Sequence, residues 1–181
     1  MQNNKAITTH PINIEQELFN IENYKNDSDP LIEKAYELID DENYEKAFEL
    51  LAFAASIDSD NIEILNGLGI TLCEMGRLQD AITILEMALR ISEDSLTFAN
   101  IAGAYWEIEE YAQAVYYYRR ALDLDPGFLE AHYNIINLYM DMNSLYSALI
   151  HCKEFCDKFP EDEEGRELMS DIMLNLAISM Y

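Results

Sequence analysis

The sequence predicts an all-α protein built as a stack of similar helix pairs. Apolar residues recur at the three- and four-residue spacing of amphipathic helices along most of the 181 residues. The chain has only 6 Gly and 4 Pro, which disfavours β architectures rich in turns. One short pattern, an aromatic residue or Leu three positions before an Ala, returns every 33 or 34 residues, with its alanines at Ala47, Ala81, Ala114 and Ala148. A period of this length indicates an array of two-helix units.

The charge excludes several classes of partner. The chain has 35 Asp and Glu against 11 Lys and Arg, which gives a formal net charge of −24. Nucleic-acid binding relies on Lys and Arg to neutralise phosphate, and a surface this negative also repels anionic lipid. We therefore expect no nucleic-acid partner and no membrane insertion. The 50% of apolar and 11% of aromatic residues also distinguish the chain from a disordered acidic tail.

The composition favours a cytoplasmic protein. Residues 1–10 contain one Lys and lack the apolar core of a secretory signal. The sequence has no run of about 18 apolar residues that could span a bilayer. Its 3 Cys are too few, and odd in number, for a disulfide framework, which fits a reducing compartment.

A leading segment, residues 1–27, precedes the repeats. Asn, Thr and Pro dominate its first part. The spacing of the apolar residues Ile14, Leu18, Phe19 and Ile21 then indicates one short amphipathic helix. The alternative is that the segment stays partly flexible.

Four helix–turn–helix units follow, and we place them at residues 28–61, 62–94, 95–128 and 129–162. In each unit the recurring Ala and the residues four and seven positions after it share one face of the second helix. Small alanines on this face let the two helices approach closely. The first helices are clearest over residues 64–75, 96–108 and 128–142, and each ends at a short break, namely Gly76-Arg77, Glu109-Glu110 and Asn143-Ser144.

The unit at residues 95–128 carries the fullest pattern, with Phe98, Ile101, Ala102, Tyr105, Tyr111, Ala114, Tyr118, Ala121 and Pro126. This pattern resembles the tetratricopeptide repeat (TPR), with Phe98 where the family prefers Trp. The other units depart further, with Lys34 at a core position of the first, Glu93 in place of a proline in the second, and bulky Ile136 and Phe155 in the fourth. The resemblance implies a right-handed superhelical stack whose first helices line a concave groove for peptides or partner helices.

Residues 163–181 are expected to form a final helix, which in related arrays caps the last repeat. One apolar stripe is predicted to be buried, consisting of Met169, Ile172, Met173, Leu176 and Met180. Leu174, Ile178 and Tyr181 lie off that stripe. They are either exposed residues of an ordinary cap or a surface for a homodimer or another partner, since contiguous exposed apolar area usually marks an interface.

The family register places a set of residues in the groove. The candidate binding residues are Tyr36, Asn66, Ile70, Glu74, Asn100, Trp106, Glu107, Tyr133, Asn134, Asn137 and Asp141. Asparagine amides can pair with the backbone of an extended segment, and aromatic residues are the usual anchors of an interface. Two alternatives remain open, because Tyr36 and Tyr133 could instead pack between helices and the acids could serve solubility.

The groove positions contain no Lys or Arg. TPR domains that grip the acidic C-terminal tails of heat-shock chaperones need basic residues there, so the resemblance does not extend to that ligand. The acids would instead attract a basic or amphipathic partner and speed its approach.

The sequence shows no arrangement of residues that carries catalysis or binds a cofactor. Gly67-Leu68-Gly69 lacks the third glycine and the strand of a dinucleotide site. Cys152 and Cys156 form a possible metal pair, but both occupy inward positions of the repeat, which favours core packing. We expect no catalytic residue, no metal and no cofactor, and hence no enzyme.

Three functions fit these observations. The first is a protein–protein interaction module, or adaptor, that binds a segment of a partner. The second comes from size, charge and layout, which are similar to those of the TPR chaperones that hold translocator proteins of bacterial type III secretion systems. The third is a scaffold that self-assembles through its apolar C-terminal helix.

Overall fold

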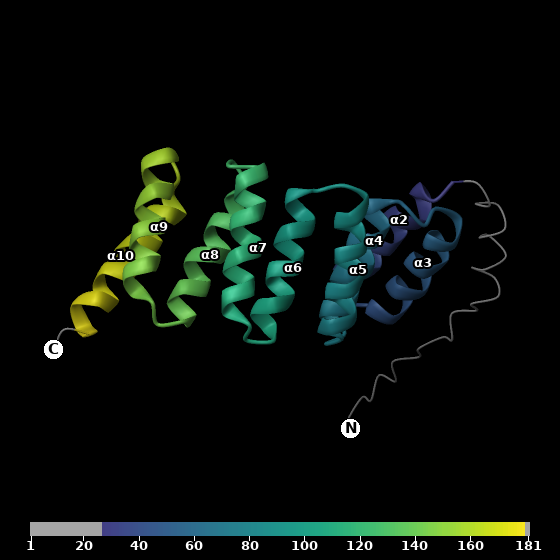
Figure 1. Cartoon of the computed structure of the whole chain (residues 1–181), viewed down its shortest axis with the longest axis horizontal. Coiled ribbons are helices and arrows are strands. Elements are labelled where there is room, and N and C mark those ends of the chain that lie inside the picture. Colours follow the sequence, from purple (N-terminus) through teal and green to yellow (C-terminus); the bar gives the residue numbers. More distant parts are fainter. Residues whose placement is uncertain (1–26, 180–181) are drawn as a thin grey trace, which may run out of the picture.

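Nine α-helices follow one another along residues 27–179, the part of the chain that the computed structural model describes. They are α2 (Asp29–Asp40), α3 (Tyr44–Ile57), α4 (Ile62–Glu74), α5 (Leu78–Ile91), α6 (Ser95–Glu107), α7 (Tyr111–Leu124), α8 (Leu129–Asp141), α9 (Leu145–Lys158) and α10 (Glu163–Ser179). Figure 1 shows them side by side in one row, from α2 and α3 at one end to α10 at the other.

Each helix packs against the next one in sequence, so that the eight helices before α10 form four successive pairs. First helices of neighbouring pairs also touch, α2 against α4 and α4 against α6. The prediction of an all-α stack of helix pairs is confirmed.

The turn inside every pair is a left-handed helix cap. Glu42, Gly76, Glu109 and Asn143 have φ angles of 57°, 72°, 63° and 52°. In the second pair the N–H of Gly76 donates to the carbonyl of Cys73, and the next N–H donates to the carbonyl of Leu72, each at 2.8 Å. The same two bonds recur in the other three turns. They satisfy carbonyls that the helix end would otherwise leave unpaired.

The recurring alanines lie in the core. Ala47, Ala81, Ala114 and Ala148 are all 0% exposed, as the spacing predicts. Buried apolar residues gather in one cluster over α2 to α4 and another that runs from Phe98 to Ile172. Lys34, at a position where the family has a core residue, is exposed and lies 2.6 Å from Glu37.

The helix α10 is fastened to α9 at the corner between them. Cys152 donates its thiol to the carbonyl of Gly165 at 3.4 Å, and the N–H of Gly165 donates to Asp162 at 2.8 Å. Cys156 packs against the core cluster without being fully buried. Both cysteines therefore serve packing in this part of the chain.

One detail of the predicted apolar stripe is wrong. Ile172 is buried, and Leu168, Met169 and Leu176 pack against the core, but Met173 is 56% exposed. The phase of α10 is set by its contact with α9, and this contact selects Leu168 in place of Met173. Leu174 and Ile178 are 60% and 65% exposed, as residues off the stripe should be.

Several sequence expectations lie outside the described residues. These are the leading segment with its short helix, and the C-terminal residues Met180 and Tyr181. Within the described part, no helix combines the length and the hydrophobicity needed to cross a membrane.

Candidate peptide-binding groove

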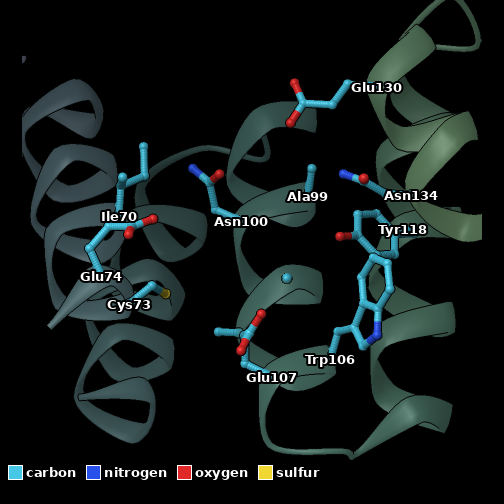
Figure 2. Close-up of a pocket in the computed structure, with 12 residues that line it drawn as sticks. Ile70, Cys73, Glu74, Ala99, Asn100, Trp106, Glu107, Tyr118, Glu130 and Asn134 are labelled. Atoms are coloured by element: carbon cyan, nitrogen blue, oxygen red, sulfur yellow. The ribbon is translucent and has the colours of Figure 1, made fainter. Parts of the chain in front are cut away.

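The helices α4, α6 and α8 together line a hollow of about 290 Å³. Figure 2 shows α6 in the middle, with residues of α4 on one side and residues of α7 and α8 on the other. Six of the predicted groove residues meet here, namely Ile70, Glu74, Asn100, Trp106, Glu107 and Asn134.

Small residues of α6 form the floor of the hollow. Ala99, Gly103 and Ala104 line it. A Cβ added to Gly103 would meet only the hydroxyl of Tyr118, at an ordinary contact distance of 3.8 Å. The missing side chain therefore leaves space that a ligand can fill down to the helix backbone.

Two aromatic rings form one wall. Tyr118 is 2% exposed, and its hydroxyl points into the hollow (Figure 2). The ring of Trp106 stands edge-on to Tyr118, with the ring centres 6.5 Å apart. The indole N–H of Trp106 donates to Asp141 at 2.9 Å, which fixes the ring and ties α6 to α8. Asp141 thus acts on the groove through Trp106 and does not line the hollow.

An amide pair connects α4 to α6 beneath the groove. Asn66 is 3% exposed and donates to the hydroxyl of Thr97 at 2.8 Å. The side-chain amide of Asn100 donates to the side-chain oxygen Oδ1 of Asn66 at 3.2 Å. Asn66 therefore holds two helices at a fixed spacing, and among these residues it is Asn100 that reaches the hollow.

Tyr36, Tyr133 and Asn137 do not line the hollow. The hydroxyl of Tyr36 donates to the carbonyl of Glu63 at 3.5 Å, and that of Tyr133 donates to Asp162. The ring of Tyr133 also lies 5.2 Å from that of Phe155. Both tyrosines are engaged between helices, which is the packing alternative, while Asn137 is exposed on α8.

The electrostatic environment of the hollow is negative. Burial, together with the carboxylates of Glu74 and Glu107, raises the pKa of the Cys73 thiol to about 11. Burial also raises the pKa of the Tyr118 hydroxyl, Glu130 and Glu107 add to the rise, and a hydrogen bond with Asn134 opposes it. The helices α4, α6 and α8 contain no Lys or Arg, so they supply no basic side chain to balance these acids.

Sequence reasoning missed Tyr118 as a groove residue, because it belongs to a second helix and takes the core position held by Leu51 and Leu85 in earlier units. One signal was available. A buried tyrosine must place its hydroxyl beside a polar group or water, and a leucine has no such need.

Comparison with known families adds to this geometry. Residues 62–126 match the family described as the tetratricopeptide repeat. Residues 62–126 are tetratricopeptide repeats. Of the similar structures below, one was described with a peptide-binding site and one with a bound peptide.

Similar solved structures cover most of the TPR stack. MamA from Desulfovibrio magneticus RS-1 is 17% identical, with a TM-score of 0.67 over 76% of this chain and 78% of that one. YrrB, described as a TPR protein with an unusual peptide-binding site, is 21% identical, with a TM-score of 0.64 over 88% and 83%. The first TPR of Spaghetti (RPAP3), solved with the HSP90 peptide SRMEEVD, is 15% identical, with a TM-score of 0.59 over 64% and 93%. At these identities the likeness concerns the fold alone.

A sequence relative is Protein FlbA of Caulobacter vibrioides, 27% identical over 122 residues. The match covers 67% of this chain but 20% of FlbA, so the chain spans about a fifth of that relative's length.

Proposed function

We infer that this TPR stack is an adaptor that binds an extended or helical, basic or amphipathic segment of a partner protein in the hollow lined by α4, α6 and α8. The observation that carries the proposal is the unbalanced charge of those helices. They contribute Glu74, Glu107 and Glu130 to the hollow and contain no Lys or Arg. In this proposal the groove binds a partner segment and carries out no chemical step.

The negative charge of the hollow also predicts which kind of ligand should not bind. The peptide SRMEEVD carries adjacent glutamates and a terminal aspartate. In this groove its carboxylates would approach Glu74, Glu107 and Glu130 without a compensating cation. We expect a basic segment to bind and this acidic peptide to be rejected.

The test begins with a random dodecapeptide display library selected on the immobilised full-length chain. Enriched peptides are labelled and titrated by fluorescence polarisation against Gly103→Leu, which fills the hollow. Gln79→Leu, which places the same leucine side chain on the exposed side of α5 and away from the hollow, serves as the control. Groove ligands should lose about tenfold or more in affinity with Gly103→Leu and little with Gln79→Leu, a difference of about 1.4 kcal/mol.

The proposal fails if no enriched peptide distinguishes Gly103→Leu from Gln79→Leu. It also fails if SRMEEVD binds as tightly as the enriched basic peptides, because the charge argument would then be wrong.

A second candidate is self-assembly through α10, favoured by the exposure of Met173, Leu174 and Ile178 on one helix. Leu174→Lys with Ile178→Lys should then lower the solution mass measured by light scattering to that of a monomer. Met87→Lys on α5, another exposed apolar residue, should leave the mass unchanged. A monomeric wild-type chain would exclude this candidate.

A further inference from the structure

The first helix of every repeat ends in an acid. Asp40, Glu74, Glu107 and Asp141 are the last residues of α2, α4, α6 and α8. A carboxylate at the C-terminal end of a helix opposes the helix dipole, which favours cations there. Neither α4 nor α6 has a basic residue in its last turn. These acids therefore do not stabilise the helices that carry them.

Two of these acids reach the same hollow. Glu74 and Glu107 both line it, on neighbouring helices, and both act on the thiol of Cys73 between them. Figure 2 shows Glu74, Cys73 and Glu107 on the side of the hollow where α4 and α6 end. Two carboxylates and two helix C-termini thus concentrate negative potential at one end of a cavity.

The rest of the cavity is shaped for an apolar stem. The floor at Gly103 is open to the helix backbone, and the wall consists of Tyr118 and Trp106. Tyr118 is almost fully buried, yet its hydroxyl opens on the hollow (Figure 2). Methylene groups pack well on such rings, and a cation near a ring face gains further attraction.

We propose that this hollow is a specificity pocket for one Lys or Arg side chain of the bound segment. The stem lies over Gly103 along Tyr118 and Trp106, and the charged head lies between Glu74 and Glu107. This inference rests on the proposed function, since it names the side chain that the groove selects.

The test uses the tightest peptide whose binding to the full-length chain depends on Gly103. Each Lys is replaced by norleucine and each Arg by citrulline, one position at a time, and affinities are measured by fluorescence polarisation. One position should lose tenfold or more. In the variant Glu74→Gln with Glu107→Gln, the same replacement should cost less than threefold, because the cation has lost its partners.

The control is Glu45→Gln with Glu49→Gln, which removes the same charge from exposed positions of α3. This variant should keep the full tenfold loss at the sensitive position.

The outcomes separate the two proposals. If peptides depend on Gly103 but no Lys or Arg position couples to Glu74 and Glu107, the pocket inference is overturned and the adaptor function stands. Equal loss of coupling in the α3 variant overturns the inference as well, because the effect would then come from net charge. If no peptide depends on Gly103, both proposals fall.

Discussion

Two glycines of the first helices meet opposite surroundings, which makes them informative at the scale of single residues. A Cβ on Gly69 would lie 2.4 Å from a methyl carbon of Leu85, which is fully buried and cannot move away. A Cβ on Gly103 would enter the open hollow.

We therefore predict opposite effects of the same substitution. Gly69→Ala should destabilise the protein by about 1–3 kcal/mol through overpacking. Gly103→Ala should stabilise it by up to about 1 kcal/mol, because alanine is the better helix former. Urea unfolding followed by circular dichroism measures both, and changes of equal sign would contradict the geometry.

The individual residues also show where sequence reasoning stops. Periodicity and small-residue spacing were enough to predict that Ala47, Ala81, Ala114 and Ala148 are buried, because helix geometry alone puts them on one face. The same register placed Asn66 in the groove. Its partner Thr97 lies 31 positions later in the chain, so no local pattern could indicate that the Asn66 amide is used inside the stack.

At the scale of the element, the four inner turns share a left-handed residue that is Gly in one pair and Glu in two. A side chain in this conformation costs about 1–2 kcal/mol, and glycine avoids the cost. The turns with Glu42 and Glu109 are therefore strained where the turn with Gly76 is relaxed.

Glu109→Gly should accordingly raise the free energy of unfolding by up to about 1 kcal/mol, after the loss of chain entropy is subtracted. The reverse change, Gly76→Ala, should lower it by a similar amount. Thermal unfolding of the two variants gives the comparison. A destabilised Glu109→Gly protein would mean that the glutamate has contacts that outweigh the strain.

The helix α10 illustrates what an element does not reveal by itself. Its sequence contains more apolar residues than one face can bury, so the stripe could be drawn in two phases. Packing against α9 decides between them, and it places Leu168 against the core while Met173 stays exposed. The existence of the helix was predictable from periodicity, but its rotation depends on a neighbour.

At the scale of the whole molecule, two histidines link the last pair of helices to the turn before it. Nε2 of His132 lies 3.1 Å from the carbonyl oxygen of Pro126 and must donate to it. When His132 is neutral, its Nδ1 accepts from Nε2 of His151, at 3.2 Å. Nζ of Lys158 donates to the same carbonyl of Pro126 at 2.6 Å. One ring nitrogen of the His132–His151 contact must stay unprotonated, so the two imidazoles cannot both be protonated while the contact lasts.

The contribution of the histidine pair to the stability of the fold should therefore fall in mild acid. Burial lowers the pKa of His151 to about 4, with His132 and Arg119 adding to the effect, and burial also lowers the pKa of His132. Between pH 6.5 and 4 the two histidines bind protons in the unfolded chain but not in the folded chain, so protonation favours unfolding as the pH drops.

The comparison of wild type with His151→Gln isolates this term, because relief of repulsion among the carboxylates at low pH is common to both proteins. The difference in urea midpoint between them should shrink or reverse from pH 7 to pH 4.5. A difference that does not change with pH would show that the histidine pair is not titrating against the fold.

The chain contains a single tryptophan, and this residue, Trp106, lines the hollow of the groove. Because Trp106 stands on the wall of the hollow and is held to α8 by Asp141, its emission reports on one location. The protein thus carries an intrinsic optical probe. A change in spectrum on mixing with a candidate partner would register occupancy of the groove, or a change in the spacing of α6 and α8, without any label.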